Sequence, residues 1–230
     1  YMIINAFNKI VKLFKGNYFE VDKRVPINYI LSISFSKVID LLFGVIKLKK
    51  IGPYFISPST KIVSRKLIKL KGNIQIQHSC FINALSIEGI VFGNNISIHP
   101  YCSLESSGSI LDLGKGIIIG DNVGIGRNCH FGGAGGITIG DDTIFGQYVS
   151  IHSENHNFSK ADIKIRNQGV SRQGIKIGSN CWIGAKVTIL DGAIINDGCV
   201  IAASALVKAG VYEKNTIYGG VPAKKIKSRF

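Results

Sequence analysis

The sequence predicts a mainly β fold, a parallel β-helix solenoid, from two observations. In the C-terminal third, large apolar residues recur every six positions: Ile177, Ile183, Ile189, Ile195, Ile201 and Val207. Four residues after each of the first five, the chain carries only small or slim residues: Cys181, Val187, Ala193, Cys199 and Ala205. A period of six matches neither an α-helix, at about 3.6 residues per turn, nor a plain strand, at about two. It is typical of short strands that form the faces of a prism, with the large side chain in the core.

The same spacing extends upstream and sets the size of the solenoid. It continues through Ile119, Ile125, Phe131 and Ile137, shifts by two to Ile139, Phe145 and Ile151, and has weaker echoes from Ile62 onward. Three hexads make a triangular coil of about 18 residues, so the repeating stretch predicts about seven coils. We therefore expect one β-helix domain over residues 61–210. The residue after each large one is expected at a turn, where Gly178, Gly184 and Asn196 tolerate a positive φ.

Residues 1–60 differ in kind and are expected to be helical. Residues 1–15 predict a basic helix with an apolar stripe of Ile3, Ile4, Phe7, Ile10, Val11 and Phe14. After Pro26, an apolar run from Ile27 to Leu48 approaches the length of a membrane-spanning helix. Lys37 and Asp40 lie inside that run, so a spanning helix would have to bury a charge pair. A spanning helix is the least favoured interpretation; the other two are that the helices cap the first coil or that they form a basic amphipathic surface that docks on anionic lipid.

Charge is distributed unevenly along the chain. Residues 1–73 carry 14 Lys and Arg against 3 Asp and Glu, a net +11; residues 74–207 carry 8 against 10, a net −2; residues 208–230 carry 6 against 1, a net +5. The predicted coil is thus slightly acidic, and the basic charge lies at the two ends. Nucleic-acid binders usually carry their basic patch on the folded face, so we do not expect a nucleic-acid partner.

The five cysteines fit the repeat with none left over. Each falls four residues after a large apolar position, which predicts buried small residues: Cys80, Cys102, Cys129, Cys181 and Cys199. An odd number without a CxxC pair indicates neither a disulfide framework nor a zinc site. Free thiols suit a reducing compartment, and we expect a cytoplasmic protein, peripheral at the inner face of the membrane if the N-terminus docks there.

One segment interrupts the spacing completely. After Ile151, the next residue in register is Ile175 or Ile177, and residues 153–173 are polar. Loops of this length in compact domains are usually functional or disordered. A regular solenoid has no pocket of its own, so we expect this loop to help form one against a neighbouring subunit.

Three motifs resemble a known family. The segments IHSENHNF (151–158), IGSNCWIGAKVTILDGAIINDGCVIAASALV (177–207) and YGGVPAKKIK (218–227) are similar to the hexapeptide-repeat acyltransferases. More narrowly, they resemble the galactoside and xenobiotic acetyltransferases and the bacterial polysaccharide O-acetyltransferases. The resemblance implies a left-handed β-helix, a homotrimer, and acetyl-CoA as the cosubstrate. It covers roughly the last half of the chain.

The resemblance also implies the residues of the reaction. His156, after Asn155 at the start of the protruding loop, matches the family's general base, a role that suits an imidazole with a pKa near 6.5. His152 is the rival; a supporting or orienting role is expected for His152 and Asn155. Transfer is expected to be direct, without a covalent enzyme intermediate. The coil at Phe131-Gly132-Gly133 lacks the family's acceptor-facing Asn, so a simple galactoside is not expected.

The same family places coenzyme A along the last coils. Backbone groups at Ala185 and Ala203 are expected to pair with the pantetheine amides, and Lys208, Lys224 and Lys227 to meet the phosphates. Residues 211–230 are expected to form a short basic tail.

These features together predict an acetyl-CoA-dependent O-acetyltransferase that acts on a sugar hydroxyl in cell-surface polysaccharide biosynthesis. The alternative enzyme is an N-acetyltransferase of a nucleotide-linked amino sugar, with a small hydrophobic acceptor third. A metal site of three histidines is not expected, because only His152 and His156 are close in sequence and His130 is far from both. The non-enzyme alternative is a purely structural β-helix, which would need neither the polar loop nor the basic tail.

Overall fold

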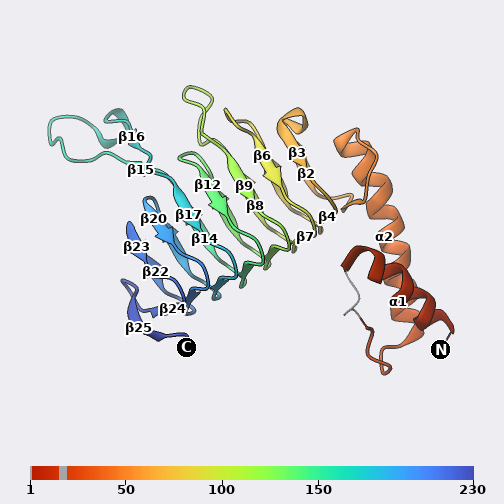
Figure 1. Cartoon of the computed structure of the whole chain (residues 1–230). Helices are drawn as coiled ribbons and strands as arrows, with labels where there is room; N and C mark the ends of the chain where they lie inside the picture. Colours follow the sequence, from red (N-terminus) through yellow and green to blue (C-terminus); the bar gives the residue numbers. More distant parts are fainter. Residues whose placement is uncertain (1, 16–19) are drawn as a thin grey trace.

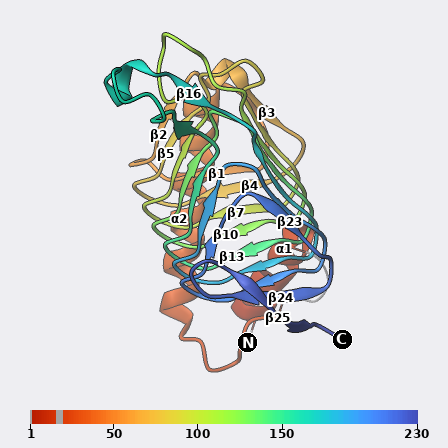
Figure 2. The same ribbon diagram turned by 90° about the vertical axis from the view of Figure 1, so that its left-hand side faces the viewer.

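Three flat parallel sheets form the faces of a triangular prism (Figures 1 and 2). The computed structural model describes residues 2–15 and 20–230. Within these residues each of seven coils adds one strand to every sheet, which agrees with the number of coils that the six-residue spacing predicts.

The strands are short and are grouped here by sheet. Sheet 1 contains β1 Tyr54–Ile56, β4 Ile74–Ile76, β7 Ile96–Ile98, β10 Gly124–Ile125, β13 Ile144–Phe145, β18 Trp182–Ile183, β21 Val200–Ile201, β24 Thr216–Gly219 and β25 Lys224–Ser228. Sheet 2 contains β2 Lys61–Val63, β5 Phe81–Asn83, β8 Ser103–Glu105, β11 His130–Gly132, β14 Ser150–His152, β19 Thr188–Leu190 and β22 Leu206–Val207. Sheet 3 contains β3 Ile68–Leu70, β6 Ile90–Phe92, β9 Ile117–Ile119, β12 Ile137–Ile139, β17 Ile175–Ile177, β20 Ala193–Ile195 and β23 Gly210–Tyr212.

The core follows the six-residue register. Residues of the large register pair directly between coils, as in Phe131 with Ile151 and Ile177 with Ile195, so their side chains stack along the axis. All six large and all five small residues of the C-terminal repeat are buried, as predicted.

All five cysteines are free and buried, also as predicted. Burial raises the pKa of Cys181 to about 11, and the neighbouring thiol of Cys129 together with burial raises that of Cys102 to about 12. These thiols are therefore protonated at neutral pH.

A ladder of short polar side chains joins the coils at the corner between sheets 3 and 1. Each rung is a side-chain oxygen that accepts the backbone N–H of the preceding coil, at 2.7–3.1 Å. The acceptors are Asn94, Asp121, Asp141, Ser179 and Asp197. The ladder satisfies backbone donors that a turn would otherwise leave unpaired.

The expected positive φ at Gly178, Gly184 and Asn196 is wrong. The left-handed residues lie two further on, at Asn180, Lys186 and Gly198. Glycine is needed at 178 and 184 for a different reason, which is the closeness of the next coil. A Cβ at Gly178 would lie 2.3 Å from Asp197 Oδ1, and one at Gly184 would lie 2.6 Å from Ala203 N.

Two helices precede the solenoid. Helix α1 spans Met2–Lys15, and α2 spans Ile27–Leu48, directly after Pro26 and before Lys49 in the left-handed region. Helix α2 packs on β1 at the open end of the first coil, and α1 contacts α2 (Figure 1). In the expected stripe of α1, Ile4, Phe7 and Val11 are half-buried, while the side chains of Ile3, Ile10 and Phe14 lie outside the described part of the chain, as do Tyr1 and residues 16–19.

The C-terminal residues extend the solenoid. Strands β23 and β24 continue sheets 3 and 1 beyond residue 210, where the basic tail was expected to begin. Strand β25 then turns back antiparallel to β24. The basic tail is therefore partly an edge strand of sheet 1.

Candidate active site

Two loops leave the solenoid at the corner between sheets 2 and 3. The shorter, residues 106–116, follows β8, and the longer, residues 153–174, follows β14 two coils later. The longer loop includes the antiparallel strands β15 Asn155–His156 and β16 Val170–Ser171 and the 3-10 turn η2 Ile165–Asn167. It stands away from the prism beside the corner, as Figure 2 shows.

Arg172 ties the two loops together. Its Nε lies 2.6 Å from Glu154 Oε2 at the start of the long loop, and its Nη1 lies 2.8 Å from Asp112 Oδ2 in the short one. The Arg172 and Glu154 side chains are 20% and 24% exposed, so water screens this pair less than an ordinary surface pair, whereas Asp112 is 69% exposed. Both loops are thus held above the outer face of sheet 2.

A cavity of about 200 Å³ lies beneath these loops. Strands β8, β11 and β14 contribute Glu105, His130 and His152, which point outward from sheet 2 in neighbouring coils. Its lining is completed by Ser107, Gly108, Gly132, Ala134, Ser153 and Glu154. The cavity therefore brings together two imidazoles and two carboxylates from separate parts of the sequence.

Gly132 lies beside the His130 ring, where a Cβ would be in ordinary van der Waals contact. It pairs with Glu105 on one side and His152 on the other, and a Cβ there would lie 3.4 Å from His130 Nε2. His130 Nδ1 is 3.9 Å from Glu105 Oε1, which also accepts a 2.6 Å hydrogen bond from Ser103 Oγ. The carboxylate is thereby oriented toward the imidazole.

His152 is exposed at the cavity, more so than the half-buried His130, and it contacts polar neighbours on its own sheet. Its Nε2 lies 2.6 Å from Ser150 Oγ, and its ring centroid is 5.5 Å from that of His130. Burial first, and then the nearby charge of His130, lower the pKa of His152. His152 is therefore neutral at pH 7 and can accept a proton.

The expected base, His156, lies on the hairpin rather than in the cavity lining. His156 and Asn155 form β15, both exposed, with His156 paired to Val170 of β16. The hairpin is ordered by its own bonds: Asn157 N–H donates to Gly169 O at 3.0 Å, and the Gln168 amide binds the backbone at Lys160 and Ile163. His156 is thus presented toward solvent at the edge of the cavity's loop, four residues beyond His152.

Four of the five residues expected to bind coenzyme A lie elsewhere on the prism. Ala185 and Ala203 occupy the corner between sheets 1 and 2 in consecutive coils, where Ser204 N–H donates to Ala185 O at 2.8 Å. Lys224 and Lys227 lie on β25, both exposed. Lys208 follows β22, so it is at the opposite end of that strand from Ala203. Lys208 is therefore at the corner between sheets 2 and 3, two coils beyond the point where the long loop leaves it, whereas the other expected coenzyme A residues do not share a corner with His156.

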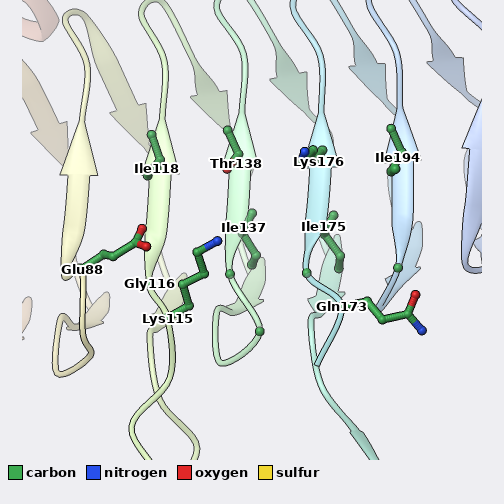
Figure 3. Close-up of a pocket in the computed structure, with 14 residues that line it drawn as sticks. Glu88, Lys115, Gly116, Ile118, Ile137, Thr138, Gln173, Ile175, Lys176 and Ile194 are labelled. Atoms are coloured by element: carbon green, nitrogen blue, oxygen red, sulfur yellow. The ribbon is translucent and has the colours of Figure 1, made fainter. Parts of the chain in front are cut away.

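A second, larger cavity of about 280 Å³ lies on the outer face of sheet 3 (Figure 3). Its floor is shaped by glycines with positive φ at the start of successive strands, Gly116, Gly136, Gly174 and Gly192. Glu88 and Lys115 lie side by side near one end, with Gln173 toward the other. It contains no histidine or cysteine, so we place the candidate chemistry in the smaller cavity.

Sequence reasoning missed several residues of the site. The motifs give no role to Glu105 or Arg172, the spacing of the histidines offers His130 only as a metal ligand, and the six-residue spacing does not separate the loop at 106–116 from the repeat. The spacing gave little signal for this loop, because Ile110 continues it six residues after Leu104 although its side chain is exposed, and only Gly116 breaks the register before Ile117. Among the described residues, no group of three or more His, Cys, Asp or Glu is placed to hold a metal ion.

Comparisons with known proteins agree with the fold and the motifs. The family described as bacterial transferase hexapeptide (six repeats) matches residues 174–209. WbbJ of Escherichia coli K12, named for O-acetyl transfer in lipopolysaccharide biosynthesis, is 31% identical over 160 residues, which cover 66% of this chain and 77% of WbbJ. Rv3034c of Mycobacterium tuberculosis, named as an acetyltransferase, is 30% identical over 157 residues, which cover 61% of this chain and 51% of Rv3034c.

Solved structures share the same architecture. AntD, an N-acyltransferase from Bacillus cereus solved with dTDP and 3-hydroxybutyryl-CoA, superposes with a TM-score of 0.56 at 22% identity, over 81% of this chain and 86% of AntD. This likeness confirms the left-handed parallel β-helix of the acyltransferases. With its coils, its motifs and its similarity to WbbJ, the chain belongs to the hexapeptide-repeat acetyltransferases.

Proposed function

We propose that the protein transfers the acetyl group of acetyl-CoA to a hydroxyl of a sugar in cell-surface polysaccharide assembly. The observation that carries this proposal is the cavity of histidines and carboxylates at the base of the long loop, in a chain related to WbbJ. Hydroxyl and carboxylate groups such as those of Glu105, Ser107 and Glu154 can orient a polar acceptor by hydrogen bonds. We place this reaction in the cytoplasm, where acetyl-CoA and reduced thiols occur together.

The chemistry requires a base beside the acceptor. The base removes the proton as the hydroxyl oxygen attacks the thioester carbon; the tetrahedral intermediate then collapses, the C–S bond breaks, and the thiolate of coenzyme A leaves and takes up a proton. His156 is the proposed base, exposed on the hairpin of the loop that borders the cavity, where it would act on an acceptor held there and on acetyl-CoA held by a second chain. His152, neutral and bonded to Ser150, is the competing base within the cavity. A covalent route through cysteine is disfavoured, because every thiol is buried.

The proposed site needs more than one chain. Within one copy, the loop bearing His156 leaves the corner between sheets 2 and 3, whereas Ala185 and Ala203 lie on the corner between sheets 1 and 2. A rotationally symmetric trimer would let the loop corner of one copy face the coenzyme corner of the next. We therefore propose a homotrimer with three shared sites.

A second candidate reaction is N-acetylation of a nucleotide-linked amino sugar. The specific observation in its favour is the presence of two carboxylates, Glu105 and Glu154, in the cavity, because carboxylates bind an ammonium group. AntD, which shares the fold, is an N-acyltransferase crystallised with dTDP.

One experiment separates the two reactions. Purified protein is incubated with acetyl-CoA and panels of surface glycans and amino-sugar nucleotides, and release of free coenzyme A is followed together with the mass of the product. A product whose acetyl group is removed by mild alkali is an ester and supports O-transfer; an alkali-stable product supports N-transfer. No coenzyme A release with either panel would contradict the sugar-acetyltransferase proposal.

A further inference from the structure

Helix α2 packs on the solenoid with the less apolar of its two faces. The face buried against the first coil contains Ile30, Asp40, Gly44 and Leu48, and Lys37 lies 3.5 Å from Asp40 beside it. Most of the remaining surface of α2 is exposed and carries large apolar residues, beside the exposed polar residues Asn28, Ser32 and Ser36. Nine apolar side chains of α2 are more than a third exposed: Ile27, Tyr29, Leu31, Phe35, Val38, Leu41, Leu42, Val45 and Ile46.

This orientation is fixed by contacts that only one face can make. Gly44 lies so close to β1 that a Cβ would overlap the carbonyl of Tyr54. Lys47 Nζ donates to Thr60 O at 2.6 Å and Lys50 Nζ to Ile68 O at 3.0 Å, which satisfies carbonyls at the open end of the first coil. A capping helix of the ordinary kind would bury its apolar face and expose its polar one. Here capping is done by Gly44 and the lysines, and the apolar face is left for another partner.

The positive charge around helix α2 indicates what kind of partner would cover its exposed apolar residues. Residues 1–73 carry a net +11, and exposed lysines stand at both ends of α2, Lys23 before it and Lys49 after it, while Lys9 is exposed on α1. Arg24 and Lys50 are exposed as well, but Arg24 pairs with Asp22 and Lys50 donates to Ile68 O. Packing two such faces together would bring like charges into one interface. An anionic bilayer offers apolar depth beneath negative headgroups, which matches both the apolar face and the cations around it.

We propose that the exposed face of α2 is a membrane-docking surface that lies in the plane of an anionic phospholipid bilayer, with the neighbouring lysines at headgroup level. By length and composition α2 is also the one helix in the described ranges that could cross a membrane, with 17% of its most apolar window buried. A spanning α2 would lose its packing on β1, so the docked, in-plane arrangement is the one that keeps the solenoid capped. This surface is independent of the acetyl-transfer proposal, and it would hold the solenoid beside membrane-borne acceptors.

The test uses the full chain and two matched double variants. Phe35→Gln with Leu42→Gln changes two α2 residues that are 70% and 59% exposed; Ile87→Gln with Val211→Gln changes two residues on the solenoid that are 73% and 68% exposed. Each protein is sedimented with vesicles of phosphatidylcholine alone or with about 30% phosphatidylglycerol, at about 50 mM and about 500 mM NaCl. Circular dichroism and light scattering report folding and mass.

We expect the unmodified chain and the Ile87/Val211 variant to bind the anionic vesicles at low salt and to lose at least about tenfold in partitioning at high salt. The Phe35/Leu42 variant should remain folded and bind at least about tenfold more weakly, because it loses two buried apolar contacts with lipid. The proposal is overturned if the unmodified chain does not bind at low salt, or if the Phe35/Leu42 variant binds as well as the control. A fall in mass of that variant with unchanged vesicle binding would assign the face to self-association instead.

Discussion

Arg172 and Asp112 join two loops that leave the solenoid two coils apart, with 2.8 Å between Nη1 and Oδ2. Because Arg172 also binds Glu154, a single guanidinium fixes both walls of the cavity that contains His130 and His152. The shape of the candidate acceptor site thus depends on one side chain outside the family motifs.

We expect Arg172→Ala to loosen the long loop without unfolding the coils. The substitution leaves Glu154 without its cation, so hydrogen exchange of residues 153–171 should speed up and the KM for the acceptor should rise by about tenfold. Arg166→Ala, an exposed arginine of the same loop, is the matched control and should change neither quantity. Unchanged exchange in the Arg172 variant would show that the loop is held by other contacts.

The two candidate bases can be separated by substitution. His156→Ala should lower kcat at least about a hundredfold with acetyl-CoA affinity nearly unchanged, since general base catalysis is worth about 10²–10⁴. His152→Ala should cost less if it only orients the acceptor. The assignment reverses if the His152 variant loses more turnover than the His156 variant, and single-turnover kinetics with isothermal titration of acetyl-CoA supplies both readings.

His130 should influence the titration of His152. Burial is the larger cause of the lowered pKa of His152, and the charge of His130 is the second. In His130→Gln the second cause disappears, so the pKa of His152 should move upward toward its usual value while staying below it. Proton NMR of the His152 Cε1–H resonance measures this shift, and an unmoved pKa would show that the two imidazoles are not coupled.

The same lowered pKa predicts how stability depends on pH. In the unfolded chain the pKa of His152 is about 6.5, which is above its pKa in the folded protein. As pH falls, the His152 imidazole is therefore protonated in the unfolded chain before it is protonated in the folded one. Above about pH 6.5 the imidazole is neutral in both states and its titration does not change the free energy of unfolding. Below that pH the unfolded state binds more protons, so the free energy of unfolding decreases. Thermal midpoints of the unmodified protein should drop more between pH 7 and pH 5 than those of His152→Gln; an equal drop would contradict the assignment.

Gly184, at a corner, and Gly124, in strand β10, should differ sharply in their tolerance of a methyl group. Gly184→Ala places Cβ 2.6 Å from Ala203 N, whereas at Gly124 the nearest atom is Ile144 Cγ2 at 3.8 Å. We expect Gly184→Ala to be destabilised by about 1–3 kcal/mol, a fall of several degrees in Tm, and Gly124→Ala to change by less than about 0.5 kcal/mol. Equal Tm values would show that the coils can separate locally.

Mixed oligomers test the shared site. His156→Ala removes the base, and Ala203→Tyr, at an exposed corner position, should block the coenzyme groove. If each site joins the loop of one chain to the groove of the next, random mixing of the two inactive proteins restores about a quarter of the sites. A monomeric mass by light scattering at micromolar concentration, or no regain of activity, would contradict the trimer.

The periodicity predicted the core because each coil places a large and a small residue at the same two buried positions. The buried residues between Ile177 and Val207 could therefore be identified one by one from the sequence. The periodicity could not predict the cavity, because His130 and His152 are brought together only by the pairing of β11 with β14, and that pairing depends on the exact length of the coil between them. Nor could it orient α2: a run as apolar as Ile27–Leu48 has no polar face to mark the solvent side. Gly178 and Gly184 show a third limit, since a glycine required by a neighbouring coil looks the same in sequence as one required by its own φ.

The polar ladder at the corner between sheets 3 and 1 affects how much sequence identity two related solenoids are expected to share. Three types of side chain, asparagine, aspartate and serine, accept the equivalent backbone hydrogen bond in this ladder, at Asn94, Asp121, Ser179 and Asp197. The position requires only an oxygen acceptor close to the turn of the preceding coil. Such a position can drift among several amino acids with no loss of its bond. Residue-by-residue identity therefore undercounts what two such solenoids share, and a common architecture at 22% identity is the expected result.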